Sequence, residues 1–127
     1  MRRLWPLLVL LPLAACGGPP SSPSNGGPGG TNTTTITITS AGISATQINV
    51  TPGARVTFVN QDIRSHNMTS DPHPEHTDCG EINTVGLLQP GQSRETGNLV
   101  TVRTCGFHDH DDPPPGGAKW AGRITIR

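Results

Sequence analysis

The chain has 127 residues, with nine basic and nine acidic side chains and a formal net charge of zero. This length allows one folded domain, and the neutral balance without a basic cluster excludes nucleic acid as an expected partner. Aromatic residues make up only 3% of the chain, whereas all five histidines lie between His66 and His110. Imidazoles gathered in this way indicate a binding site in that part of the chain.

The N-terminus reads MRRLWPLLVLLPLAAC, with two arginines, an apolar run from Leu4 to Leu13, and small residues before Cys16. A basic start and a short apolar run are typical of a secretory signal, and the run is too short for a membrane-spanning helix. The ending LAAC resembles the lipobox of bacterial lipoproteins, whose cysteine is lipidated. We therefore expect a signal peptide over residues 1–15 and lipidation at Cys16, with an uncleaved anchor as the alternative.

Residues 17–30 contain only Gly, Pro, Ser and Asn. Such a segment has no apolar surface to offset its ordering entropy, which predicts a flexible tether. We assign residues 16–32 to the lipidated cysteine and the tether, and residues 33–127 to the folded domain. The expected location is the bacterial cell envelope, on its periplasmic or extracytoplasmic face. A lipid anchor would be the only membrane contact of a chain that we expect to be a monomer.

Alternating apolar and polar residues predict short β-strands in the domain. The run TTTITITS (Thr33–Ser40) is the first, and Val56 and Phe58 are expected to point to one side of the next. The runs LVTVRTC and AGRITIR follow, and Pro-Gly turns separate the strands. Because no stretch shows a helical period, the pattern favours an antiparallel sandwich or barrel.

Two long stretches carry no strand pattern, residues 70–84 and 106–118. Four of the five histidines lie in them, together with Cys79. Long loops in a small β domain are more often functional than not, although polar loops can also simply face solvent.

Cysteine and histidine together indicate a transition-metal site. Zinc sites usually use paired cysteines, and the cysteines of this domain stand alone. Copper in a trigonal site takes two imidazoles and one thiolate. Cys105 and His108, in the spacing C-x2-H, can supply one pair of ligands, and the distant His66 can supply the third.

Several stretches in this order resemble the plastocyanin and azurin branch of the cupredoxins: INVTPGARVTFVNQDIRSHNM, LLQPGQSRETGNL, VRTCGFH and WAGRITIR. The resemblance covers residues 33–127. It implies an all-β, cupredoxin-like Greek-key β-sandwich of seven to eight strands, with two long loops at the metal end. It also implies one copper ion that carries one electron, with His66, Cys105 and His108 as equatorial ligands. Asn67 falls on the asparagine that hydrogen-bonds around the ligand cysteine.

The sequence departs from the family at the axial ligand. Trp120 stands where a plastocyanin has methionine, and Met68, two residues after His66, is expected to fill the core. His110 is a further candidate metal ligand, with a supporting or exposed position as the alternatives.

Cys79 offers a second interpretation, because an exported protein permits a bridge between Cys79 and Cys105. The bridge would remove the thiolate. An all-nitrogen site would then remain, built from His66, His108 and His110 with His73 or His76, and it would suit Cu(II), with zinc as the second choice.

The sequence thus predicts a membrane-tethered, one-electron copper carrier that works with an unidentified redox partner protein. The alternative is a copper-storage or copper-delivery protein with a histidine-rich site and the Cys79–Cys105 disulfide. A β-sandwich with a structural disulfide and no metal is a third possibility. No hydrolytic constellation is present, so we do not expect an enzyme.

Overall fold

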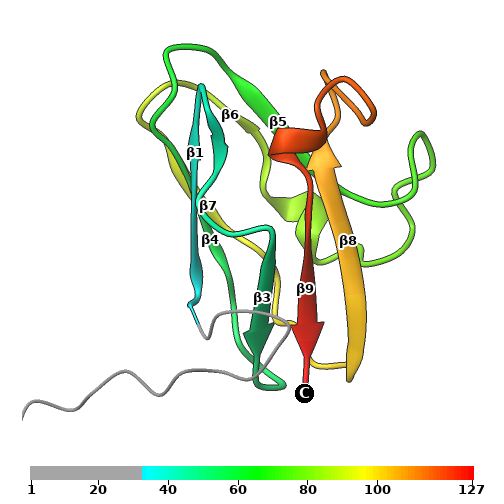
Figure 1. Ribbon diagram of the computed structural model, residues 1–127. Helices are drawn as coiled ribbons and strands as arrows, with labels where there is room; N and C mark the ends of the chain where they lie inside the picture. Colours follow the sequence, from blue (N-terminus) through cyan, green and yellow to red (C-terminus); the bar gives the residue numbers. More distant parts are fainter. Residues whose placement is uncertain (1–32) are drawn as a thin grey trace, which may run out of the picture.

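The computed structural model describes residues 33–127 and forms two packed β-sheets (Figure 1). The predicted signal peptide, the Cys16 lipidation site and the tether lie outside the described residues. Among residues 33–127 no helix is long and apolar enough to cross a lipid bilayer. The described residues are the same range, 33–127, that the sequence assigns to the folded domain.

The first sheet has four strands in the order β2-β1-β4-β7. Its strands are β1 (Thr35–Thr39), β2 (Gly42–Ile43), β4 (Thr57–Asn60) and β7 (Ser93–Glu95). Ile36 and Ile38 of β1 are fully buried, as are Val56 and Phe58, while the residues between them are less buried. The alternation predicted for the runs of β1 and β4 is confirmed, because one face of each packs on the core. Strand β7 is exposed along its length and shows no such alternation.

The second sheet has five strands in the order β3-β9-β8-β5-β6. Its strands are β3 (Gln47–Val50), β5 (His66–Ser70), β6 (Gly86–Leu88), β8 (Arg103–Asp109) and β9 (Gly122–Ile126). Two short 3-10 turns, η1 (Ile82–Thr84) and η2 (Ala118–Trp120), complete the described elements. The all-β sandwich is confirmed, with nine strands in the described part where seven to eight were expected. The expectation of antiparallel pairing is wrong for two pairs, because β1 pairs with β4 and β3 pairs with β9 in parallel, which makes both sheets mixed.

Strand β8 is displaced from its predicted position. The run LVTVRTC predicts a strand over residues 99–105, but the strand begins at Arg103 and continues to Asp109. Val100 and Val102 are exposed, so their alternation does not mark a buried strand. The first four residues of the loop predicted over 106–118 therefore belong to β8, and this shift changes the geometry of the metal ligands.

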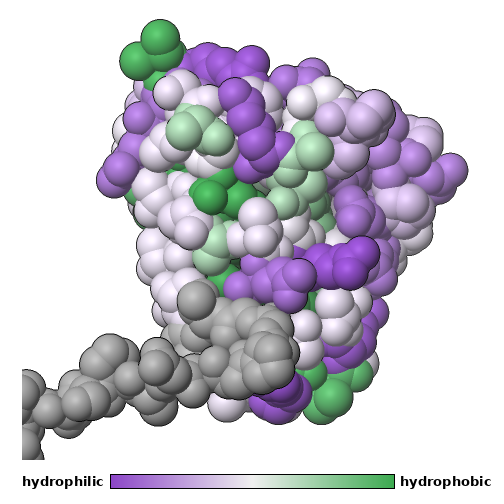
Figure 2. Space-filling view, in the orientation of Figure 1, coloured by the Kyte–Doolittle hydropathy of each residue, from purple (hydrophilic) through white to green (hydrophobic). Residues whose placement is uncertain are grey.

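The two loops of interest lie at the same end of the five-stranded sheet. The segment between β5 and η1 projects beside β8, and the segment after β8 continues from the same end of that strand (Figure 1). On the face shown in Figure 2, strongly hydrophobic residues form separate small areas instead of one continuous patch. Within residues 33–127 the most exposed large apolar side chain is that of Ile63, which lies on the β4–β5 connection.

Candidate metal centre

Cys105 and His108 lie on opposite faces of β8. Side chains alternate along a strand, so residues three positions apart point to different sides. The Cys105 face carries Phe107, whose ring packs edge-on against Phe58 of the other sheet at 5.2 Å, and is therefore the core face. His108 points to the outer side of the sheet. Cys105 and His108 could converge on one metal ion only if residues 105–108 formed a loop. These residues belong to strand β8, so their side chains point to opposite sides.

Cys105 forms a disulfide with Cys79. The Cα atoms are 5.7 Å apart, and both residues are fully buried. A disulfide sulfur is not a thiolate, so the prediction of Cys105 as a metal ligand is wrong in this structure. The alternative interpretation, a Cys79–Cys105 bridge, is the arrangement that the structure has.

His66 lies between two buried carboxylates. Its Nδ1 is 2.7 Å from Asp109 Oδ2, and its Nε2 is 3.0 Å from Asp62 Oδ2. Both ring nitrogens are therefore engaged. In the β5–β8 pairing Met68 lies opposite Asp109, so Cys105 lies beyond the C-terminal end of β5, far from His66. The structure does not bring His66, Cys105 and His108 together.

Trp120 closes the sandwich beside His66. The two ring centroids are 5.2 Å apart, and the Trp120 Nε1–H donates a hydrogen bond to the Thr39 carbonyl. Arg64 and Lys119 place their cationic groups about 4 Å from the indole centroid. The place predicted for an axial ligand is thus filled by packed side chains. Met68 is fully buried, and its prediction as a core residue is confirmed.

The His66 contacts give a pH-dependent contribution to stability. The hydrogen bond with His66 lowers the pKa of Asp62 below its usual value of 3.8. A depressed carboxyl pKa stabilises the fold above the unfolded-state value, and this contribution is lost as pH falls through the folded-state value. We expect the free energy of unfolding to decrease as the pH drops below 3.8. Urea denaturation at a series of pH values measures it. Asp62→Asn should flatten this slope, and an unchanged slope would contradict the assignment.

Three other histidines converge outside the core. His73 and His76 belong to the loop after β5, and His110 follows β8 directly. Each offers a ring nitrogen, and these three atoms lie within 4.8 Å of one another. The backbone N–H of His110 donates to the Asn67 carbonyl at 2.7 Å, which fixes His110 beside β5. Asn67 itself therefore supports His110 and does not surround Cys105.

The loop after β5 is closed at its base by its own aspartates. The Asp78 N–H donates to the Asp71 carbonyl at 2.7 Å, and the Asp78 carboxylate accepts the Gly106 N–H at 2.8 Å. The Asp71 carboxylate lies over Gly106, where a Cβ atom would overlap with it. Gly106 is thus needed for the close approach of the loop to β8. These contacts bring His73 and His76 against the end of β8.

The hydrogen bonds of His76 fix which of its nitrogens can bind a metal. Nδ1 is 2.8 Å from the Ser70 carbonyl, an acceptor, so Nδ1 carries the proton. In this neutral tautomer Nε2 is unprotonated, and it accepts a hydrogen bond from His110 Nδ1 at 2.8 Å. A backbone carbonyl on the non-coordinating nitrogen is the usual support of a metal-binding histidine.

The environment of His73 favours its neutral form. Loss of solvent around the ring lowers the pKa of His73, and positive charge on His110, His108 or His76 would lower it further. A neutral imidazole is the form that binds a metal. Three imidazole ligands with no thiolate suit Cu(II), or secondarily zinc.

No family model matches the sequence, and no curated protein matches it. Solved structures do match. A purple cupredoxin from Nitrosopumilus maritimus has 16% identity and a TM-score of 0.56, over 73% of this chain and 98% of that one. Plastocyanin from Dryopteris crassirhizoma has 20% identity and a TM-score of 0.54, over 73% and 99%. An oxidised amicyanin variant has 14% identity and a TM-score of 0.55, over 73% and 80%.

The chain has the cupredoxin fold. Within this cupredoxin fold, the ligand set implied by resemblance does not fit a copper ion, because Cys105 is oxidised and His66 has no free nitrogen. The set that fits is His73, His76 and His110. Of these three, the sequence indicates His110 as a candidate metal ligand directly, and His73 or His76 only in the alternative with the Cys79–Cys105 disulfide. The signal for the other two was their spacing in DPHPEHTDC, a histidine pair held close to a cysteine.

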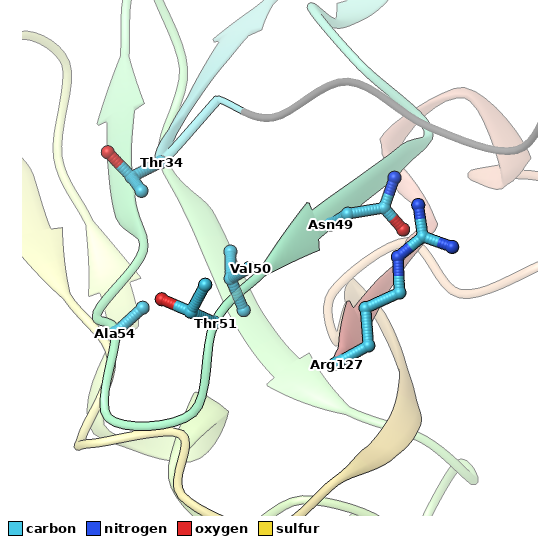
Figure 3. A pocket seen from close by; sticks show the side chains of 6 residues that line it. All are labelled: Thr34, Asn49, Val50, Thr51, Ala54 and Arg127. Carbon is cyan, nitrogen blue, oxygen red and sulfur yellow. The ribbon is translucent and has the colours of Figure 1, made fainter. Parts of the chain in front are cut away.

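A cavity of about 300 Å³ lies at the opposite end of the cupredoxin fold (Figure 3). Its described lining residues are Thr34, Asn49, Val50, Thr51, Ala54 and Arg127. Figure 3 shows the polar ends of Asn49 and Arg127 on one side of the cavity and the turn with Thr51 and Ala54 on another. None of these described residues is a histidine, cysteine or carboxylate side chain, so they do not form a second transition-metal site.

Proposed function

We propose that this protein binds one copper ion through His73, His76 and His110, and stores or delivers it outside the cytoplasm. The observation that carries the proposal is the convergence of three ring nitrogens within 4.8 Å. Metal–nitrogen bonds are about 2.0–2.1 Å long, so small side-chain movements bring all three nitrogens onto one ion. The protein acts as a binding protein and not as an enzyme.

The donor set and its position support copper. Imidazole binds Cu(II) more tightly than the other divalent first-row metals. Acidic side chains of the same loops, among them Glu75 and Asp111, add negative charge that attracts a cation. His73 is exposed and the other two rings are half-buried, which leaves the ion open to exchange with a recipient protein.

The proposed location is the bacterial cell envelope, with Cys16 lipidated and the Gly/Pro/Ser segment as tether. Lipidation would hold a monomeric domain at the membrane surface. The Cys79–Cys105 bridge supports an oxidising compartment, since disulfides persist there and not in the cytosol.

One-electron transfer is a second candidate, and the fold is the observation that favours it. Its structural neighbours include a fern plastocyanin whose oxidised and reduced structures are both described. In this chain such a role would run through imidazole-bound copper with an unidentified redox partner. Reversible reduction with a small change in coordination would support it, and loss of the metal on reduction would count against it.

Copper titration of the purified metal-free protein tests the proposed function. We expect one Cu(II) per chain and no intense visible band, because no thiolate is available. His76→Ala and His110→Ala should each weaken the affinity for Cu(II) at least about 100-fold. Loss of a residue that only hydrogen-bonds to a metal ligand can already cost about 10–100-fold, and these two residues are proposed as ligands themselves. Thr77→Ala, an exposed position of the same loop, is the matched control. Equal affinity in all four proteins would overturn the proposal.

A further inference from the structure

His108 has a buried ring nitrogen without a hydrogen-bond partner. The side chain is 1% exposed, and its Nδ1 is 2.6 Å from Asp71 Oδ1. Its Nε2 is buried and has no partner among the described residues. Buried polar atoms are almost always paired in folded proteins, so an unpaired one calls for a ligand or a water.

The unpaired nitrogen belongs to a ring that lies against the three-histidine site. The His108 centroid is 5.1 Å from that of His76 and 5.6 Å from that of His73. His108 and His110 are two positions apart at the end of β8, so they point to the same side of the chain. His108 is not one of the three residues whose ring nitrogens all lie within 4.8 Å of one another, so its ring adjoins that group and is not counted in it.

The hydrogen bonds of His108 match those of His76. The Asp71 carboxylate accepts a hydrogen bond from His108 Nδ1–H, just as the Ser70 carbonyl does from His76 Nδ1–H. The neutral tautomer with its proton on Nδ1 leaves Nε2 of each ring as the nitrogen that can bind a metal. A carboxylate behind a histidine orients the ring and raises its basicity as a metal ligand.

We propose that His108 is a fourth ligand of the copper site, bound through Nε2, and that Asp71 is the residue that positions it. This inference rests on the proposed function. Copper binding would satisfy the buried Nε2, and four imidazole nitrogens form a donor set that Cu(II) accepts in tetragonal geometry.

Gly106 makes the Asp71 arrangement possible. The Asp71 N–H donates to the Gly106 carbonyl at 3.0 Å, which continues the β5–β8 pairing by one residue. The carboxylate then lies over Gly106, where no Cβ intervenes, and reaches His108 two residues along the same face. Asp71 thus connects the loop that carries His73 and His76 to strand β8, which carries His108 and leads to His110.

Counting the coordinated nitrogens tests the inference in the wild-type protein and in two variants. Pulsed electron paramagnetic resonance of the Cu(II)-loaded protein should detect four imidazoles in the wild type and three in His108→Phe. The phenylalanine keeps a ring in the buried position. His108→Phe should still bind one copper with at least about tenfold lower affinity, and Asp71→Asn should keep four imidazoles with a 10–100-fold loss. Thr77→Ala should change neither quantity.

A second measurement does not depend on the folding of a variant. In the wild-type protein loaded with diamagnetic Cu(I), the ¹⁵N resonance of His108 Nε2 should shift together with those of the three other rings. Three imidazoles in the wild type, or a His108 resonance unmoved by copper, would overturn the fourth ligand and leave the proposed function standing. Absence of any copper binding in the wild type would overturn both.

Discussion

Replacing Cys79 and Cys105 together by alanine is expected to lower the free energy of unfolding by about 3.5 kcal/mol and to weaken copper binding more than tenfold. The bridge closes a segment with a sequence separation of 26 residues. In the chain-entropy model a cross-link of this span stabilises the fold by about 3.5 kcal/mol. Small domains have a total stability of about 5–15 kcal/mol, so the change is a large fraction of it.

The effect on copper follows from where the bridge lies. His76 is three residues before Cys79, and the partner Cys105 is in the strand that leads to His110. The disulfide therefore ties the loop with two ligands to the strand with the third. Without it the loop must be ordered when the metal binds, which lowers the affinity.

Urea denaturation and Cu(II) titration of the double variant, at a temperature where it is folded, measure the two effects. Met68→Leu, a volume-conserving change in the same core, is a control that keeps the bridge and the histidines. A stability loss with unchanged copper affinity would show that the backbone contacts of Asp71, Asp78 and Gly106 hold the loop by themselves.

Strands β1 and β4 of the first sheet could be predicted from the sequence because their signal is local. The short strand β2 and the exposed strand β7 carry no such signal. Ile36 and Ile38, and likewise Val56 and Phe58, alternate with polar residues, and in the structure they are buried while their neighbours are not. A sheet with one buried face imposes this alternation whatever the rest of the chain does. The sandwich architecture follows from several such strands with turns between them.

The ligand assignment depended on where one strand ends, which the sequence does not fix. A C-x2-H pair converges on a metal in a tight loop but diverges in an extended strand. Val100 and Val102 placed the predicted strand too early, so Cys105 was assigned to the mouth of a loop. In the structure β8 continues to Asp109, and Cys105 points into the core toward Cys79.

The convergence of His73 and His76 with His110 could not be predicted for a different reason. It depends on the loop closing through Asp71 and Asp78 onto Gly106. These contacts join residues that are 35 and 28 positions apart in the sequence. Sequence spacing indicates that such a loop carries ligands but does not indicate which strand it meets. The possible disulfide was the one clue, because it links this loop to β8.

Asp109→Leu is expected to lower the free energy of unfolding by about 3–5 kcal/mol, because it leaves several donors without an acceptor and each buried one costs about 1–3 kcal/mol. Asp109 is 1% exposed. Its carboxylate is 2.7 Å from His66 Nδ1 and accepts the backbone N–H groups of Asn67 and Asp111 at 3.0 and 3.2 Å. Leucine would leave these three donors without an acceptor. The His66 ring is fully buried, so its unpaired nitrogen is the most costly of the three, and the two part-buried N–H groups add less.

Asp109→Asn is the matched variant, because it keeps the shape and one carbonyl acceptor while removing the charge. It should lose less stability than Asp109→Leu in urea denaturation near neutral pH. Both variants leave His73, His76 and His110 in the chain, so a folded Asp109→Asn should still bind one copper. A loss below about 1 kcal/mol for Asp109→Leu would be in the range of a single ordinary hydrogen bond. It would mean that packing against Trp120 and the hydrogen bond with Asp62 are enough to hold His66 in place. The hydrogen bond between His66 and Asp109 would then add little to stability.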